Sequence, residues 1–220
     1  MQKALFTLIE PAEPERRESA VVVEVPHAGL DVPATYLANL TAPARSLAQD
    51  ADLYVDELYA DAPLEGATLL IAHTSRYVLD LNRGEEDWDR EAIATNGLPS
   101  RTATNGSARM PRGLIWRLTT EGVPALARPL SLSELDERIE RIHRPYHRAL
   151  WSVLERKRER FGYAVLLAAH SMPSAARTST GEPGAARADV VPGTQGRTTS
   201  APPFIECVDA HARAFGYTIR

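Results

Sequence analysis

The sequence predicts an α/β fold, in which strands and helices alternate along the chain. Short runs rich in β-branched residues, bounded by turn residues, predict four strands at Leu5–Ile9, Ala20–Val25, Ala67–Ala72 and Tyr77–Leu81. Between the second and the third of these, apolar residues at helical spacing predict one helix over Leu47–Tyr59. A nearly continuous apolar run at Tyr163–Ala169 is typical of a strand buried on both faces, which favours a largely parallel sheet.

The longest predicted helix follows Ser131. Ser131 and Glu134 form the S-x-x-E pattern of a capping box, which marks the start of a helix. Apolar residues continue at helical spacing, and we expect the helix to run to about residue 160. Pro145 lies inside this pattern and lacks a backbone N–H, so the helix should kink or divide there. Two long irregular segments, 84–113 and 173–203, are expected around the mouth of a site.

The composition limits the class of protein. Of 220 residues, 44% are hydrophobic and 25% are charged, which is ordinary for a globular chain, and the length fits one domain over residues 1–220. A net charge of −4 argues against nucleic acid as a partner. No apolar segment approaches the roughly 20 residues of a membrane span, so we expect a cytoplasmic protein without a membrane partner. No heptad pattern or large apolar stripe indicates an oligomeric state.

Two histidines follow predicted strands directly. His27 comes after the strand at 20–25, and His170 comes after the apolar run at 163–169. If these strands are parallel neighbours, both imidazoles emerge at the same edge of the sheet. Two imidazoles and a carboxylate, with an open fourth position, form a usual catalytic zinc site, and the carboxylate could come from Asp50 or Asp52. The alternative is that each histidine is an ordinary hydrogen-bonded residue.

The segment SRYVLDLNR at 75–83 alternates between apolar and polar residues and ends in Asn82 and Arg83. The planar guanidinium of an arginine can bind a substrate carboxylate through two parallel hydrogen bonds. The alternative is an edge strand whose arginines form salt bridges.

Seven short motifs follow one another along the chain. They are VPHAG at 25–29, DADLYVDELY at 50–59, SRYVLDLNR at 75–83, GLIW at 113–116, RPYHRAL at 144–150, AAHSMPS at 168–174 and PGT at 192–194. In this order they resemble the N-formylglutamate amidohydrolase family, a relative of the zinc carboxypeptidases, over residues 20–220.

The resemblance implies a three-layer α/β/α sandwich with a mixed, largely parallel central sheet, like that of the zinc carboxypeptidases, and a zinc ion at the sheet edge. His27 and His170 match the histidines of the family's PHxG and HS motifs and look like zinc ligands. Asp52 matches the second acid of the family's Asp-Thr-Asp pattern and is the expected third ligand, with Asp50 as the alternative. Ala168 stands where the family usually has an aspartate that would orient His170.

The same resemblance suggests roles for further residues. Arg76 should help to polarise the scissile carbonyl, and Asn82 and Arg83 should hold the α-carboxylate of the substrate. His147 matches the histidine of the family's PYH motif and is expected in the catalytic site without an assigned role. His143 and His147 are spaced as a pair that could bind a second metal ion, although Pro145 between them disturbs that geometry.

The implied activity is zinc-dependent hydrolysis of the amide of an N-formyl or other N-acyl amino acid. The family default is N-formyl-L-glutamate, a small molecule with a free carboxylate, which gives formate and glutamate in histidine degradation. Two alternatives remain open: a metal- and ligand-binding member that does not complete catalysis, and a carboxypeptidase-like hydrolase of another acylated amino acid or peptide.

The general base is left unassigned by the resemblance. The glutamate that looks like the base in family members belongs to a C-terminal segment beyond the position of Arg220. Glu24 and Glu206 are carboxylates that lie within the chain, and the sequence selects neither of them.

Overall fold

A computed structural model of the chain describes residues 4–89, 91–94, 112–175, 184–196 and 198–220. It divides into two compact units, Met1–Ser171 and Met172–Arg220. The expectation of a single domain over residues 1–220 remains a prediction. Parts of the two irregular segments expected from the sequence, 95–111 and 176–183, lie outside the described residues. Within the described ranges, no helix combines the length and the apolar character that a membrane span requires.

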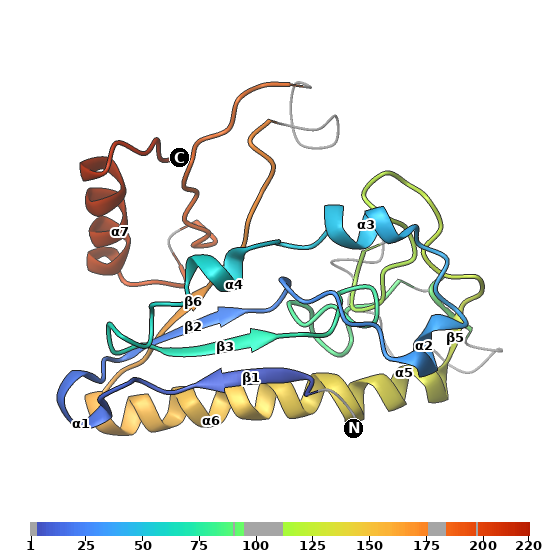
Figure 1. Ribbon diagram of the computed structural model, residues 1–220, viewed down its shortest axis with the longest axis horizontal. Helices are drawn as coiled ribbons and strands as arrows, with labels where there is room; N and C mark the ends of the chain where they lie inside the picture. Colours follow the sequence, from blue (N-terminus) through green and yellow to red (C-terminus); the bar gives the residue numbers. More distant parts are fainter. Residues whose placement is uncertain (1–3, 90, 95–111, 176–183, 197) are drawn as a thin grey trace. The chain divides into compact units, whose positions relative to one another are not determined.

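The first unit is built on a four-stranded sheet in the order β1-β3-β2-β6 (Figure 1). Its strands are β1 (Phe6–Ile9), β2 (Val21–Val25), β3 (Thr68–Ala72) and β6 (Val165–Ala168). β2 runs parallel to both of its neighbours, whereas β1 pairs antiparallel with β3. The prediction of a mixed, largely parallel sheet is therefore confirmed. The strands predicted at Leu5–Ile9, Ala20–Val25, Ala67–Ala72 and Tyr163–Ala169 are confirmed as well.

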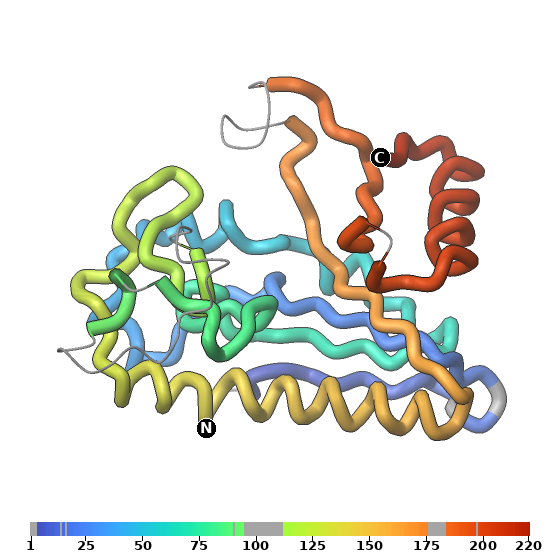
Figure 2. Tube along the Cα trace, turned by 180° about the vertical axis from the view of Figure 1, so that it is seen from behind, coloured from blue at the N-terminus to red at the C-terminus, as the bar shows by residue number. Residues whose placement is uncertain are grey.

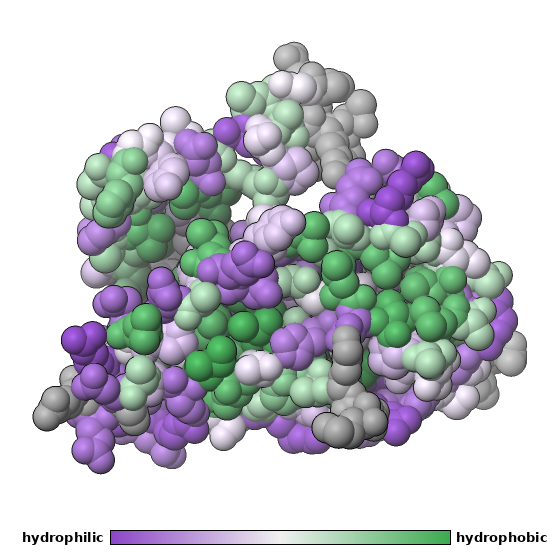
Figure 3. All heavy atoms as spheres, in the orientation of Figure 1, coloured by the Kyte–Doolittle hydropathy of each residue, from purple (hydrophilic) through white to green (hydrophobic). Residues whose placement is uncertain are grey.

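Helices pack against both faces of this sheet. α6 (Arg144–Phe161) lies along one face, where its Val153 joins the same buried cluster as Val22 and Leu70 (Figures 1 and 2). On the other face, Val55 of the short helix α4 (Val55–Leu58) packs in a second cluster with residues of β2 and β3. Alternate side chains of the two inner strands therefore enter different clusters. In Figure 3 the lower edge of the molecule, where α6 runs, is mostly hydrophilic, and hydrophobic residues gather over the strands.

The long predicted helix is present in three parts: α5 (Leu132–Arg138), the π-helix η1 (Ile139–His143) and α6. The capping box at Ser131 and Glu134 is confirmed, because each side chain accepts from the other residue's backbone N–H. The predicted division at Pro145 is also confirmed, and it begins just before the proline. Arg144 N–H donates to the carbonyl of Ile139, five residues back. This bond widens the helical turn just before Pro145, which has no backbone N–H to donate.

The remaining elements of the first unit are short. They are α1 (Pro14–Arg17), α2 (Ala34–Leu37), α3 (Ala44–Gln49), β4 (Ile93–Ala94) and β5 (Leu130–Ser131). β4 and β5 pair parallel as a separate two-stranded sheet. The second unit contains α7 (Pro202–Ala214).

The single helix predicted over Leu47–Tyr59 is wrong. The chain forms α3 and α4 with a break between them, in which Tyr54 adopts a left-handed conformation at φ 66°. The carboxylate of Asp50 accepts a hydrogen bond from the hydroxyl of Tyr77 at 2.5 Å and another from the N–H of Thr120 at 3.0 Å. These long-range bonds favour ending the helix at Asp50, and the apolar spacing gives no sign of them.

The strand predicted over Tyr77–Leu81 is also wrong. Tyr77, Val78 and Leu81 lie in turns, and Leu79 and Asp80 lie in irregular backbone between them. Val78 N–H donates to the carbonyl of Ser75, and Asp80 N–H donates to the distant carbonyl of Leu114. The prediction that the run at Tyr163–Ala169 is buried on both faces is wrong as well. β6 is an edge strand of the described sheet, and its Leu166 is 42% exposed.

Candidate metal centre

Two parallel strands deliver a pair of histidines to one edge of the sheet. His27 follows the end of β2 by two residues, and His170 follows the end of β6 by two residues. β2 and β6 pair parallel, so both carboxyl ends lie at the same edge, as the sequence predicted. The two imidazole rings lie 5.0 Å apart between centroids.

Asp52 joins the two histidines from the break between α3 and α4. Its backbone N–H donates to the carbonyl of His27 at 3.0 Å, which ties this loop to the end of β2. One carboxylate oxygen, Oδ2, lies 2.9 Å from His170 Nδ1 and 3.5 Å from His27 Nδ1. The hydroxyl of Ser171 donates to the other oxygen. The ligand atoms of His27, Asp52 and His170 all lie within 4.8 Å of one another, so the three residues could hold a metal ion.

The buried nitrogen His27 Nδ1 fits a metal ligand. It has no hydrogen-bond partner among the described residues, and a buried polar atom without a partner is costly. The other ring nitrogen, Nε2, lies 2.7 Å from Asp80 Oδ1. A carboxylate only accepts hydrogen bonds, so Nε2 carries a proton, and in the neutral ring Nδ1 keeps its lone pair. A metal ligand requires this tautomer, and a carboxylate behind the imidazole is the usual way to fix it.

The electrostatics of the group favour a positive charge between its members. Burial disfavours the charged imidazolium of His27, but Asp52 and Asp80 outweigh it and raise the pKa of His27. Although burial alone would raise the pKa of Asp52, its contacts with His170 and His27 hold that pKa well below its usual value. The carboxylate of Asp52 and the Nδ1 lone pair of His27 face each other, and they are compatible only with a proton or a metal cation between them.

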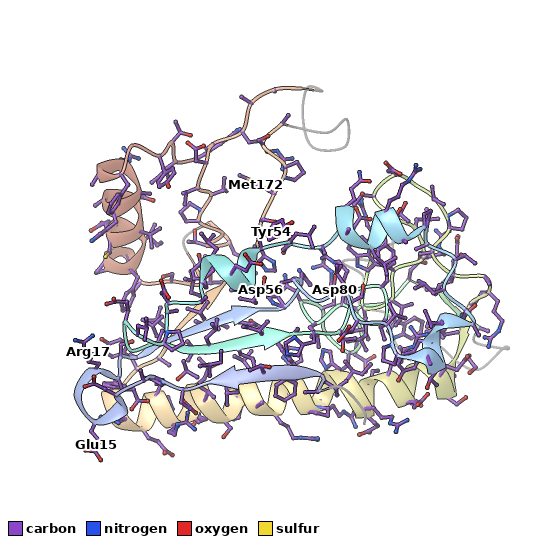
Figure 4. The ribbon with its side chains drawn as sticks, viewed as in Figure 1. Glu15, Arg17, Tyr54, Asp56, Asp80 and Met172 are labelled. Carbon is purple, nitrogen blue, oxygen red and sulfur yellow. The ribbon has the colours of Figure 1, made fainter. Side chains whose placement is uncertain are left out.

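Asp80 is a residue of the candidate site that sequence reasoning missed. It lies beyond the carboxyl ends of β2 and β3 (Figure 4) and is completely buried. Besides His27, it accepts from the guanidinium of Arg76 at 2.9 Å, from Trp116 Nε1 at 2.9 Å and from Asn82 N–H at 2.9 Å. Burial alone would raise the pKa of Asp80, but His27 and Arg76 outweigh this effect and keep that pKa well below its usual value. In the sequence, the feature that could have pointed to Asp80 was its position within the DLNR motif.

The two candidate aspartates lie in different environments. Asp52 belongs to the group with His27 and His170, and Asp50 does not. Asp50 instead accepts from Tyr77 and Thr120, as described above, and its backbone carbonyl accepts from Arg76 at 3.1 Å.

Of the three residues expected to contact substrate, Arg76 and Asn82 contact residues of the metal group or Asp80, and Arg83 is the next residue along the chain. The guanidinium of Arg76 stacks over Trp116 at 4.3 Å and is held by Asp80. The side-chain amide of Asn82 lies 3.3 Å from His170 Nε2, on the ring edge away from Asp52. Arg83 donates to the backbone carbonyls of Arg112 and Asn82, and about a third of its side chain is exposed (34%).

His147 does not join the metal group. Its Nε2 contacts the carbonyl of Leu81 at 3.0 Å, and burial, together with the charge of His143, lowers its pKa. In the part of the chain that the structure describes, His143 and His147 belong to no group of three possible metal ligands. The second metal site considered from their spacing therefore finds no third ligand there.

The fold and these contacts define a class of protein: a mixed α/β protein with a candidate metal centre of two histidines and an aspartate at the carboxyl edge of its parallel strands. The sequence pattern of the N-formylglutamate amidohydrolase family matches residues 19–220. The chain therefore belongs to the N-formylglutamate amidohydrolase family, and the resemblance inferred from the motifs is confirmed.

Two relatives are named N-formylglutamate deformylase. The one from Pseudomonas putida is 38% identical over 154 residues, which is 70% of this chain and 52% of that protein. The one from Pseudomonas aeruginosa is 34% identical over 160 residues, which is 73% of this chain and 54% of that protein. The chain thus spans about half the length of the curated relatives that it matches.

Two solved structures share the fold. An N-formylglutamate amidohydrolase from Ralstonia eutropha JMP134 has a TM-score of 0.88 and 33% identity, and the match covers 99% of this chain and 76% of that chain. A protein from Agrobacterium tumefaciens has a TM-score of 0.64 and 17% identity, over 99% of this chain and 73% of that one. The second likeness shows the fold alone.

Proposed function

We propose that the chain is a zinc-dependent amidohydrolase that hydrolyses the amide of an N-formyl amino acid, with N-formyl-L-glutamate as the first candidate substrate and formate and glutamate as products. The observation that carries the proposal is the group of His27, Asp52 and His170, with a buried and unpartnered Nδ1 on His27, in a chain of this family. The names of the two Pseudomonas relatives support the choice of substrate.

Zinc is the proposed ion because two imidazoles and one carboxylate, with a fourth position left open, form a common catalytic zinc site. When bound, the ion would polarise the formyl carbonyl and lower the pKa of a water molecule towards about 7. His27, Asp52 and His170 would hold it, and Asp80 would fix the tautomer of His27.

The remaining roles belong to residues beside the metal group. Asn82 and Arg83 would bind the free carboxylate of the substrate, since an amide and a guanidinium donate to carboxylate oxygens. Arg76, held in place by Asp80, would stabilise negative charge that develops on the carbonyl oxygen. Asn82 and Arg83 recognise a carboxylate and not an acyl group, so a related N-acyl amino acid or a short peptide is the alternative substrate.

The finer description of the fold belongs to the same proposal. We infer a three-layer α/β/α sandwich of the zinc-carboxypeptidase type that forms one domain. The helices on both faces of the sheet support the layers, and a single family pattern over residues 19–220 supports the single domain.

The first test measures bound zinc and formate release in the same preparations. The parent should bind about one zinc per chain and release formate from N-formyl-L-glutamate. His27→Ala and His170→Ala should lose both. His73→Ala is the matched control, because His73 bonds with Thr7 at 2.7 Å and lies outside the metal group.

Two results would contradict parts of the proposal. A folded parent that takes up no zinc after supplementation would remove the metal site. A parent that binds zinc and N-formyl-L-glutamate without releasing formate would favour the binding-only alternative.

A further inference from the structure

Two histidines outside the metal group hold the backbone on either side of Asn82. His143 ends η1 and His147 lies in the first turn of α6, and their rings are tilted by 42° to each other with centroids 4.2 Å apart. His143 Nε2 lies 2.9 Å from the carbonyl oxygen of Arg83, and His147 Nε2 lies 3.0 Å from that of Leu81. A carbonyl oxygen only accepts hydrogen bonds, so both Nε2 atoms carry a proton and donate it.

The backbone that they hold has no support from a strand ladder. Leu81, Asn82 and Arg83 form a turn, and Leu81 is only 2% exposed. Buried backbone groups outside regular structure need partners elsewhere. Asp80 accepts from the N–H of Asn82, and the two imidazoles donate to the flanking carbonyls. Three side chains therefore fix the path of the backbone through Asn82.

Each imidazole has further neighbours. Burial, and then the charge of His143, lowers the pKa of His147, which keeps that ring neutral with one N–H to donate to Leu81. On the other ring, His143 Nδ1 lies 3.6 Å from a carboxylate oxygen of Glu85. Glu85 is fixed in turn by two hydrogen bonds of 2.9 Å from the guanidinium of Arg144.

We propose that His143 and His147 are positioning residues, which bind the carbonyls on both sides of Asn82 and thereby hold Asn82 and Arg83 where they receive the substrate carboxylate. The inference rests on the proposed function. The two imidazoles act through the backbone, and the side chain of Asn82 extends from it to within 3.3 Å of His170 Nε2. Their loss should weaken substrate binding and leave the metal in place.

The test compares two substitutions at His147. His147→Leu removes the hydrogen-bond donor and puts an apolar side chain of similar reach in its place. It should raise KM for N-formyl-L-glutamate about tenfold, because small displacements of binding groups are costly. Its kcat and zinc content should stay near those of the parent, since the lost interaction serves substrate binding. His147→Gln returns an N–H donor and should restore most of the affinity.

Lys157→Met is the matched control. Lys157 lies on the same helix, is completely buried and donates to the backbone carbonyl of Ser19 at 2.8 Å, at the start of β2 and away from the metal group. This variant should lower the unfolding temperature and leave KM unchanged. A purely structural role for His147 would give the same pattern as the control.

Calorimetry with N-formyl-L-glutamate on the zinc-loaded protein gives a second reading that does not need turnover. If the parent, His147→Leu and His147→Gln all bind the ligand with the same affinity, the positioning role alone would be overturned. Loss of zinc in a folded His147→Leu would also overturn it, because the histidine would then act on the metal site. A parent that neither binds nor hydrolyses the ligand would overturn the proposed function and this inference together.

Discussion

Asp80 Oδ1 lies 2.7 Å from His27 Nε2, and this contact between two buried side chains determines which nitrogen of His27 faces Asp52. The proton on Nε2 is committed to Asp80, so the lone pair of Nδ1 points towards the space shared with Asp52 and His170. The candidate metal centre would therefore depend on a residue that is not itself a ligand.

The first prediction concerns that contact. Asp80→Asn should lower zinc affinity by about 10- to 100-fold, which is typical when the partner of a metal-bound histidine is lost. Competition with a chromogenic chelator measures the affinity. Asp89→Asn is the matched control, because Asp89 is also buried and pairs with Arg117, outside the metal group. Equal zinc affinities in the two variants would rule out the assigned role of Asp80.

The second prediction separates the neighbouring aspartates. Asp52→Asn should abolish stoichiometric zinc binding, because the charged ligand between the two histidines is lost. Asp50→Asn should keep the zinc and lower the free energy of unfolding by about 1–3 kcal/mol, the usual cost of disturbing buried hydrogen bonds such as those from Tyr77 and Thr120. Elemental analysis and urea unfolding distinguish the two results. Loss of zinc in Asp50→Asn would show that the assignment is reversed.

The third prediction concerns the start of the long helix under the sheet. Ser131→Ala removes the side chain that accepts from Glu134 N–H and should cost about 1 kcal/mol of stability. Ser152→Ala, at an exposed position within α6, should change the stability by less than about 0.5 kcal/mol. Urea unfolding followed by circular dichroism measures both. An equal effect of the two changes would show that the capping box adds no stability.

The sequence predicted the parts of the fold that local patterns specify. The strand before His27 and the strand before His170 are runs of apolar residues, and their parallel pairing places both imidazoles at one edge whatever the loops do. The capping box at Ser131 is equally local, since it needs only two residues three positions apart.

The parts that the sequence did not predict depend on distant partners. The helix expected through Asp50 is interrupted where Asp50 binds Tyr77 and Thr120, which are 27 and 70 residues further along the chain. The segment Tyr77–Leu81 forms turns and irregular backbone instead of the expected strand, and its Asp80 accepts from His27, Arg76 and Trp116 at once. Spacing within one segment carries no information about such contacts, although they shape the site.

The last prediction concerns Glu24, one of the two carboxylates that the sequence offered as a general base. Glu24 lies in β2 and is only 7% exposed. Burial raises its pKa, against the opposing influence of the nearby Tyr146, His170 and His27. In the folded, metal-free chain the carboxyl group therefore favours its neutral form more than in the unfolded chain.

The sign of the pH dependence follows from this raised pKa. Below the unfolded value of 4.5, Glu24 is neutral in both states and burying it costs no charge. As the pH rises from 4.5 through the raised pKa of the folded chain, Glu24 ionises freely in the unfolded chain. In the folded chain it must either keep its proton or become a buried charge, so the folded chain loses stability relative to the unfolded chain. Glu24→Gln cannot ionise, so it should stabilise the metal-free protein at about pH 8, and the gain should shrink towards about pH 5.

Urea midpoints of the chelator-treated proteins at the two pH values measure this gain, and Glu65→Gln, at an exposed carboxylate, is the control. Formate release by zinc-loaded Glu24→Gln then decides the catalytic question. Retained turnover together with higher stability would mark Glu24 as a buried carboxyl group outside the reaction. Loss of turnover in the folded, zinc-loaded variant would instead make Glu24 the leading candidate for the base, because glutamine keeps the shape of the side chain and cannot take a proton.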